Sequence, residues 1–576
     1  MFTQLVAGCY QNIPSPLLYL VLQSPDMKIK SIALITITAV ALLPGCSSDK
    51  EKKATSDSDT AMAADIKHHI AVLANDSLLG RKPFTVGEDK TIAYISAQFK
   101  KLGLEPGNKG SYYQDVPMVE IGAAAAPTMQ ITGKTPLSLK MAEDFVAATR
   151  QELPSVDLKN SPLVFAGYGI VAPEFKWNDY KDLDVKGKTV VVLVNDPGFK
   201  SPEKLFKGDT MTYYGRWTYK YEEAARQGAA GVLIVHQTEP ASYGWQVIQN
   251  SFTGSKLYLQ QADKHMNRCK VEGWLSEAAA KKLLAGAGIT DDMRAYARKK
   301  DFKAVPLNSF VSVRLKNSLK YSTSHNVIAT IKGSTTPGEY VLYSAHWDHF
   351  GVKSPAIKGD SIYNGAVDNA SGVAAILAIA KKFTQVKDKP KRSVVFLAVT
   401  AEEQGLLGSE YYGTHPVYPL NKTVADLNLD ALSDFGETSD FSITGKGQND
   451  LDDYVMALTT PKGWKVVGDK TPGSGSYYRS DHFNFAKVGV PALDLHNGAA
   501  SIEKGEAFGT AKLKEYNDEH YHQPSDEYSD DMNTLGMAQT SDLMYQLGVK
   551  LAGETTFPGW KKGSEFKLIR EKSMGK

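Results

Sequence analysis

The C-terminal half of the chain predicts an α/β fold, in which a mixed, doubly wound sheet carries helices on both faces. Short apolar runs, typical of buried strands, alternate with a helical pattern there. Strands are expected at 326–331, 340–344, 393–400 and 425–429, and a helix at 373–383. This alternation is typical of sheets covered by helices on both sides. Polar motifs follow the strand ends, which is where sites gather in such sheets.

A stretch with a different pattern interrupts this domain. Its expected elements are strands at 163–169, 187–194 and 228–235 and a helix at 219–227. The chain has 576 residues, which is too long for one ordinary domain. We therefore expect a smaller, β-rich domain over residues 135–317, inserted into a larger domain formed by residues 63–134 and 318–576.

The first part of the larger domain predicts two helices, at 65–74 and 87–102, because apolar residues recur there at helical spacing. Hydrophobic residues make up 42% of the chain and charged residues 23%, which is typical of soluble globular proteins. The net charge is only +2, and no arginine-rich block or basic stripe is present. We therefore expect no nucleic acid among the partners.

The N-terminus predicts an export signal. A basic stretch beginning at Met27 precedes an apolar run over residues 32–43. A membrane-spanning helix needs about 20 apolar residues, so this run fits the core of a secretory signal instead. Met27 also offers a second start, which would make residues 1–26 an upstream extension.

Leu43-Pro44-Gly45-Cys46 resembles a bacterial lipobox, in which the cysteine is lipidated and becomes the mature N-terminus. We therefore expect a signal peptide over 1–46, a lipid anchor in the membrane at Cys46 and a flexible polar tether over 47–62. Ser47 resembles the outer-membrane sorting pattern, which implies an outer-membrane location facing the periplasm or the cell exterior. The alternative is a plain signal peptide with a chance cysteine. Cys269 would then be a buried structural thiol rather than a nucleophile.

Metal-ligand residue types cluster after the predicted strands of the larger domain. They are His346, Asp348, Asp368, Glu402, Glu403, Asp430 and His522. Nitrogen and oxygen donors of this kind hold the divalent metals that do hydrolytic work. Asp368 precedes a helix and could bridge two ions. One of the adjacent glutamates can bind metal while the other acts as a base. Asp348 is placed to accept the second ring N–H of His346.

Each motif is weak alone, because His-x-Asp and Glu-Glu occur by chance and Asp-Asn-Ala-Ser-Gly can simply cap a helix. Together and in order, they resemble the M28 family of metallopeptidases. The matching segments are Ser344-Ala345-His346-Trp347-Asp348-His349, Gly365-Ala366-Val367-Asp368-Asn369-Ala370-Ser371-Gly372, Ala401-Glu402-Glu403-Gln404-Gly405, Asn428-Leu429-Asp430 and Tyr521-His522-Gln523-Pro524. The inserted stretch resembles the protease-associated (PA) domain through Gly167-Tyr168-Gly169, Lys186-Gly187-Lys188 and residues 225–235.

The resemblance implies a zinc-exopeptidase-like phosphorylase/hydrolase fold with two zinc ions. Asp368 would bridge them, His346 and Asp430 would complete one site, and Glu403 and His522 the other. Glu402 would be the general base. Tyr477, which precedes the Ser480-Asp481-His482 segment, would stabilise the oxyanion, and His482 would be structural. His349, His496 and His520 match no ligand position, so surface or supporting roles are expected for them. Manganese and cobalt accept the same donors.

The expected activity is that of an aminopeptidase acting on peptides with a free N-terminus. A glutamate-carboxypeptidase-like enzyme, which also carries a PA domain, is one alternative. A glutaminyl cyclase shares the fold but uses one zinc and lacks the insertion. A non-catalytic receptor on the same fold is an alternative of a different class, although that branch loses the metal ligands that are all present here.

Overall fold

The computed structural model describes residues 57–290 and 292–575. The predicted signal peptide, Cys46 and the tether over 47–56 lie outside the described residues. In the described part of the chain, no helix has the length and apolar character that a membrane span requires.

The larger domain is built on a mixed sheet with the strand order β1-β13-β17-β14-β18-β21-β19-β20. The strands are β1 (Glu105–Pro106), β13 (Val305–Ile331), β17 (Arg392–Val399), β14 (Thr336–His346), β18 (Thr423–Asn428), β21 (Ala492–Asn497), β19 (Asp440–Ile443) and β20 (Lys465–Gly468). The four central strands β17, β14, β18 and β21 are parallel, whereas β13 is antiparallel to β17 and β19 is antiparallel to β21. The sheet is therefore mixed, as predicted.

Helices cover both faces of this sheet. One face packs against α1, α2, α8 and α13, and the other against α9 and α11. The helices are α1 (Asp57–Leu73), α2 (Val86–Lys101), α8 (Ser371–Gln385), α13 (Leu535–Gly553), α9 (Leu407–Thr414) and α11 (His482–Lys487). Successive β17 side chains alternate between the two cores, with Phe396 in the first and Leu397 in the second. An unbroken apolar run such as 394–399 follows because both faces are buried.

The first helix starts earlier than the sequence predicted. α1 begins at Asp57, so residues 57–62 are helical rather than part of a flexible tether. Met62 lies four residues before Ile66, which lies four before Ile70, and all three are buried in one core. The segment was predicted to be a tether because its composition is polar. One methionine is nevertheless enough to continue the buried face of the helix for another turn.

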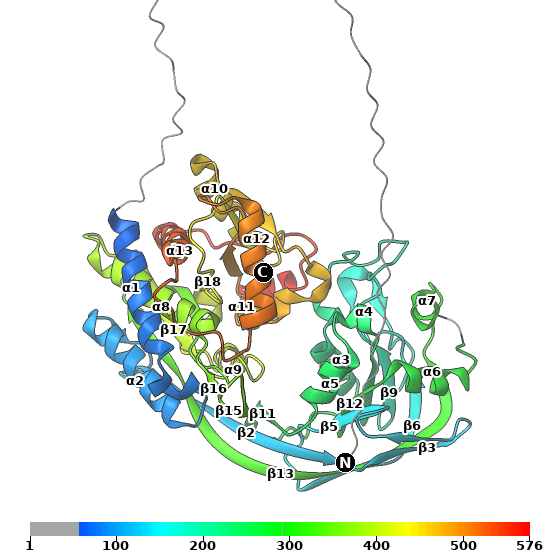
Figure 1. The fold of residues 1–576 in the computed structure, drawn as a ribbon. Helices are drawn as coiled ribbons and strands as arrows, with labels where there is room; N and C mark the ends of the chain where they lie inside the picture. Colours follow the sequence, from blue (N-terminus) through cyan, green and yellow to red (C-terminus); the bar gives the residue numbers. More distant parts are fainter. Residues whose placement is uncertain (1–56, 291, 576) are drawn as a thin grey trace, which may run out of the picture. The chain divides into compact units, whose positions relative to one another are not determined.

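Two long antiparallel strands, β2 (Tyr113–Ala125) and β13, connect the larger domain to the insertion (Figure 1). The core of the insertion includes Met129 and Ile131, so it begins before the expected residue 135. There β13 also pairs with β3 and β6. A second parallel set, β6-β9-β10-β12, with β5 antiparallel at its edge, forms the centre of the insertion. These strands are β3 (Thr128–Gly133), β6 (Ser155–Phe165), β9 (Thr189–Leu193), β10 (Gly231–Val235), β12 (Val271–Leu275) and β5 (Phe145–Ala148).

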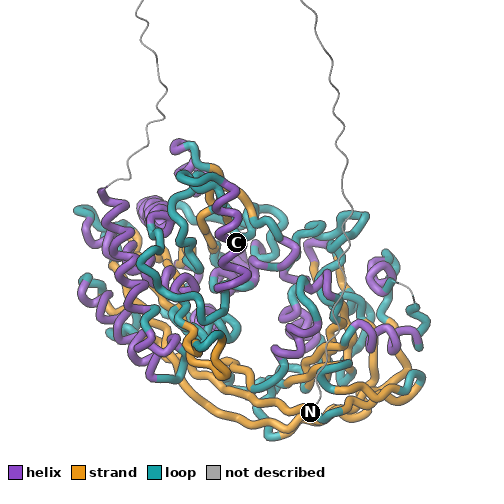
Figure 2. The backbone as a smooth tube through the Cα atoms, in the orientation of Figure 1, coloured by secondary structure: helices purple, strands orange, loops and turns teal. Residues whose placement is uncertain are grey.

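The insertion also contains α3 (Trp217–Arg226), α4 (Thr238–Ala241), α5 (Trp245–Ser251), β11 (Ser255–Leu259), α6 (Glu277–Ala285) and α7 (Met293–Arg298) (Figure 2). Cys269 is buried and free, and burial raises the pKa of its thiol, so its predicted burial is confirmed. The insertion contacts the larger domain through ion pairs. Lys487 of α11 lies 2.7 Å from Glu222 of α3, and Lys207 lies 2.6 Å from Glu565.

Candidate metal centre

Three adjacent parallel strands end at one cluster of donor side chains. His346 is the last residue of β14, Glu402 and Glu403 follow the end of β17, and Asp430 follows the end of β18. Asp368 lies in the segment that leads into α8. His522 comes from the loop after the helical turn Tyr516–His520. The sheet therefore brings together all five predicted metal ligands, which are separated by up to 176 positions in the sequence.

The two carboxylate oxygens of Asp368 face two different sets of partners. Oδ1 lies 3.1 Å from Nε2 of His346, and this nitrogen lies 3.2 Å from Oδ1 of Asp430. Oδ2 lies 3.2 Å from Nε2 of His522, which is 3.3 Å from Oε2 of Glu403. This is the arrangement that a carboxylate bridging two ions requires.

One close contact in the cluster does not form an ordinary hydrogen bond. Nδ1 of His349 lies 2.5 Å from Oε1 of Glu403, yet the contact lacks hydrogen-bond geometry and both atoms are buried without a hydrogen-bond partner. His346, Asp368 and Asp430 place one donor atom each within 4.8 Å of one another, and so do His349, Asp368 and Glu403. Orphaned buried donors are rare in proteins. Convergent nitrogen and carboxylate donors of this kind fit divalent metal ions.

The cluster concentrates negative charge in a buried place. Burial, together with the charges of Asp368 and Glu402, raises the pKa of Glu403 well above its usual range. Burial opposes protonation of His346, but Asp430 and Glu402 outweigh it and raise the pKa of this imidazole well above its usual range. Carboxylates collected in this way are stabilised by a nearby cation.

The two neighbouring glutamates occupy different positions. Glu403 belongs to the donor group with Asp368, whereas Glu402 belongs to neither donor group. The nearest ring nitrogen to Glu402 is Nε2 of His346, at 3.9 Å from its Oε2. Its backbone N–H donates to Oδ1 of Asp348 at 3.0 Å, which holds the turn after β17. Glu402 thus lies beside the donor cluster but is not one of its donors.

Asp348 holds His346 in a different way from the one predicted. The Nδ1 atom of His346 contacts the backbone oxygen of Asp348 at 3.1 Å, while the Asp348 carboxylate is 3.8 Å away. Because that carboxylate accepts the backbone N–H of Glu402, it supports the glutamate turn instead. The backbone carbonyl still provides the contact that fixes a ligand imidazole.

Further side chains tie the donor loops together. Asp526 accepts the backbone N–H groups of Val367 and Asp368 at 2.9 and 3.0 Å. Asn369 donates to the backbone oxygen of Leu429 at 3.0 Å, which links the Asp368 loop to the Asp430 loop. Ser480 donates to Oδ2 of Asp430 at 2.6 Å. Three non-glycine residues in these loops, Ala401, Ala431 and His522, have positive φ angles of 53°, 50° and 59°. Strained backbone of this kind is typical of functional sites.

Arg81, which the sequence analysis did not single out, clamps two of these loops. Its Nε donates to the backbone oxygen of Trp347 at 2.8 Å and Nη2 to that of Gly365 at 2.9 Å. Nη1 donates to the backbone oxygens of Leu73 and Asn364. One buried guanidinium thus joins α1 to the loops that carry His346 and Asp368.

The tyrosine chosen from the sequence lies elsewhere. Tyr477 packs against Tyr478, His482 and Phe566, and its buried hydroxyl has no hydrogen-bond partner. Besides burial, the charges that raise its pKa are those of Glu565, Asp452 and Asp494, none of which is a donor of the cluster. These contacts give the oxyanion role predicted for Tyr477 no support, because spacing along the chain does not show which way an aromatic ring turns.

Tyr521 is the tyrosine that lies against the donor cluster. Its ring stacks on that of His522 with centroids 3.8 Å apart. After burial, the charges that raise its pKa are those of Asp368, Glu402, Glu403 and Asp430. Its position directly before His522 was the available signal.

His349 was expected on the surface or in a supporting role, but the structure buries it and places it in one of the two donor groups. It is fully buried, and Asp368 and Glu403 are its donor neighbours. His482 is also fully buried, with both ring nitrogens lacking a hydrogen-bond partner, in keeping with a structural role.

Residues 326–547 match the sequence profile of Peptidase family M28. All five predicted ligands and Glu402 fall within this M28 segment. Over 216 residues the chain is 35% identical to Aminopeptidase NAALADL1 of Mus musculus, covering 33% of this chain and 27% of that protein. Over 84 residues it is 45% identical to a probable zinc metalloprotease of Pyrenophora teres f. teres, covering 15% and 17%. The chain thus spans about a quarter or less of these two relatives.

Among solved structures, the chain is similar to an aminopeptidase from Aneurinibacillus sp. strain AM-1. The TM-score is 0.44 and the sequence identity 20%, over 86% of this chain and 95% of that one.

Proposed function

We propose that this chain is a zinc-dependent aminopeptidase that removes N-terminal amino acids from peptides. The observation that carries the proposal is the split of Asp368, whose two oxygens face two separate histidine–carboxylate pairs. The match of the same segment to Peptidase family M28 supports it, as do the names of the matched relatives.

Two divalent ions would be held by residues of this cluster. His346 and Asp430 would complete one site, Glu403 and His522 the other, with Asp368 shared and His349 supporting Glu403. When bound, such ions polarise a peptide carbonyl and lower the pKa of a coordinated water. The mixed imidazole and carboxylate donors fit zinc, and a relative that matches this chain over 84 residues is named a probable zinc metalloprotease.

The chain's own residues supply the proton transfers and the orientation. Glu402, which lies beside the donor groups, takes a proton from the attacking water and returns it to the leaving amine. The hydroxyl of Tyr521, which lies against the cluster, is placed to donate a hydrogen bond to the carbonyl oxygen as negative charge develops on it. Asp348, Asp526 and Arg81 hold the loops in position.

The proposal is tested with peptides that differ only at their termini. We expect release of the N-terminal residue from a free peptide, loss of this activity with a chelator and its return with zinc. Activity that survives chelation would exclude a metallopeptidase. Release of the C-terminal residue from an N-acetylated peptide would instead support the carboxypeptidase alternative. A protein that binds zinc but cleaves neither would favour the receptor alternative.

We also propose that the chain is exported and carries a lipid on Cys46. The basic start, the apolar run and the lipobox-like segment of residues 27–46 support this. In a bacterial host, Cys46→Ser should move the protein from the membrane fraction to the soluble fraction, whereas Cys9→Ser, which lies upstream of Met27, should leave it anchored. Wild-type protein found in the soluble fraction would contradict the proposal.

A further inference from the structure

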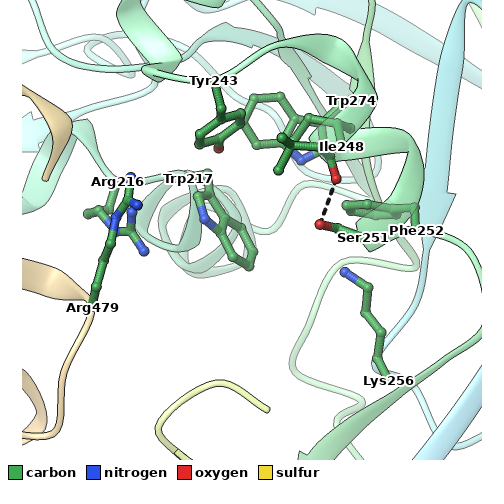
Figure 3. Close-up of a pocket in the computed structure, with 10 residues that line it drawn as sticks. Arg216, Trp217, Tyr243, Ile248, Ser251, Phe252, Lys256, Trp274 and Arg479 are labelled. Atoms are coloured by element: carbon green, nitrogen blue, oxygen red, sulfur yellow. Dashed lines mark hydrogen bonds between the residues drawn. The ribbon is translucent and has the colours of Figure 1, made fainter. Parts of the chain in front are cut away.

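A pocket outside the donor cluster lies where the insertion meets the larger domain (Figure 3). Its volume is about 250 Å³. Its walls come from α3, α5, β11 and β12 of the insertion and from the segment before α11 of the larger domain. Aromatic side chains, among them Trp217 and Trp274, form much of the lining. Such walls can hold the apolar and backbone parts of a small ligand.

The polar lining of this pocket is positively charged. Arg216, Lys256 and Arg479 line it, and no aspartate or glutamate does. In the part of the chain that the structure describes, none of these three cations has a carboxylate within 4.0 Å, although the surrounding domains contain many ion pairs. Figure 3 shows Arg216 and Arg479 on one side of the pocket and Lys256 on the other. The pocket thus offers charge to an anion from two sides.

The Arg216 side chain is available to a ligand. Its Nε is buried without a hydrogen-bond partner, and within the described residues no side-chain nitrogen of Arg216 donates to a protein acceptor. Burial, together with the neighbouring charge of Arg479, lowers the pKa of its guanidinium to about 10. Arg216 and Arg479 thus place two guanidinium groups near each other without a protein carboxylate between them. A carboxylate of a ligand could accept charge-assisted hydrogen bonds from both.

Arg479 connects this pocket to the candidate metal centre. It directly precedes Ser480, which donates to Oδ2 of Asp430 at 2.6 Å. Consecutive Cα atoms are about 3.8 Å apart, so the pocket wall and the donor cluster share one short segment. Arg479 is itself exposed, and among the residues that the structure describes its guanidinium donates only to the backbone oxygen of Ser474 at 2.9 Å and to Ser242 at 3.4 Å. A peptide at the metal centre could therefore extend toward these cations.

We propose that this pocket binds a carboxylate of the peptide substrate, either its C-terminal α-carboxylate or an acidic side chain. The inference rests on the proposed peptidase function and adds a substrate class to it. The insertion would then contribute directly to substrate selection, through Arg216 and Lys256. Short peptides and acidic peptides would be preferred over long neutral ones.

The kinetic test compares matched tripeptides with a free N-terminus. One pair is Leu-Ala-Ala with a C-terminal acid or an amide, and the other is Leu-Glu-Ala amide or Leu-Gln-Ala amide. We expect kcat/KM to be about tenfold higher for the charged member of at least one pair, the size of one charge-assisted contact. The pair that shows the difference identifies which carboxylate is bound. Equal values within both pairs would overturn the inference.

Variants of the pocket arginines test whether this pocket causes the preference for charged over neutral peptides. Arg479→Gln and Arg216→Gln should each reduce the charged-to-neutral ratio toward one, with Arg216→Lys restoring part of it. Arg314→Gln is the matched control, because Arg314 is exposed, pairs with Asp157 and lies outside the pocket. It should keep the wild-type ratio. A preference that persists in both pocket variants would place the carboxylate site elsewhere and overturn the inference.

A binding measurement separates this inference from the proposed function. Titration calorimetry of the zinc-loaded protein with acetyl-Leu-Ala-Ala and acetyl-Leu-Glu-Ala amide, each against its neutral partner, needs no hydrolysis. Tighter binding of a charged probe that Arg479→Gln abolishes supports the pocket, even if no peptide is cleaved and the proposed function fails. Equal affinities for charged and neutral probes, in a protein that does cleave peptides, overturn the pocket alone.

Discussion

Glu402 and Glu403 are neighbours in the sequence, but one lies beside the donor cluster and the other within it. We therefore expect Glu402→Gln to keep its zinc content and to lose about 10²–10⁴-fold in kcat, because general acid–base catalysis is removed. Glu403→Ala should lose zinc, since one donor is deleted. Zinc analysis and turnover on a free tripeptide measure both, and Glu503→Gln, at an exposed position, serves as the control. Equal zinc content and activity in both site variants would contradict these roles.

At the same scale, Arg81 acts on the donors through the backbone. Arg81→Lys keeps a positive charge but loses the guanidinium that donates hydrogen bonds to the backbone oxygens of Trp347, Asn364 and Gly365. We expect a loss of about 3 kcal/mol in the free energy of unfolding and faster transfer of zinc to a chelator. Urea titration and chelator competition measure these quantities. Arg314→Lys, at an exposed position, should change neither the free energy of unfolding nor the rate of zinc transfer. If Arg81→Lys also left both unchanged, the hydrogen bonds of Arg81 to the donor loops would be unimportant.

At the scale of elements, α8 packs closely on the loop that follows β18. A Cβ atom added to Gly372, near the start of α8, would lie 2.2 Å from the backbone oxygen of Leu429, one residue before Asp430. In α9, a Cβ atom on Gly413 would have no neighbour nearer than 3.5 Å.

Gly372→Ala should therefore destabilise the protein by about 2 kcal/mol through overpacking and should weaken zinc binding. Gly413→Ala should hold or raise stability by up to about 1 kcal/mol, because alanine favours a helix. Urea unfolding of the two variants provides the comparison. If Gly372→Ala were as stable as Gly413→Ala, the helix–loop contact would be looser than the structure shows.

The strands and helices predicted correctly from the sequence are those that the hydrophobic pattern alone determines. The apolar run at 393–400 forms β17, and the polar motifs follow their strands because a parallel sheet collects carboxyl ends at one edge. Tertiary packing decided the rest. The helical start at Asp57 depends on a core contact of Met62, and the choice between Tyr477 and Tyr521 depends on the direction of each ring. A pattern along one segment contains neither kind of information.

At the scale of the whole molecule, Glu222 of the insertion holds Lys487 of the larger domain. Burial opposes ionisation of Glu222, but Lys487 and a hydrogen bond from Tyr213 outweigh it and lower its pKa from 4.5 to about 2. A pKa depressed by folding stabilises the native state above the ordinary pKa of 4.5, and this stabilisation is lost as the pH falls toward about 2.

Glu222→Gln should therefore cost up to about 3 kcal/mol at pH 7, and the difference from the wild type should shrink below pH 4.5. Urea unfolding at pH 7 and at pH 3.5 tests this. Glu239→Gln removes an exposed pair with Lys200 and should have little effect at either pH. A difference between wild type and Glu222→Gln that stayed constant with pH would rule out the ion pair as its cause.

The bridging role of Asp368 is the claim on which the proposed function depends. Anomalous diffraction at the zinc edge, from crystals of the zinc-loaded protein, tests it directly. We expect two peaks, one on each side of the Asp368 carboxylate, the first bounded by His346 and Asp430 and the second by Glu403 and His522. A single peak, or peaks that do not contact Asp368, would contradict the account.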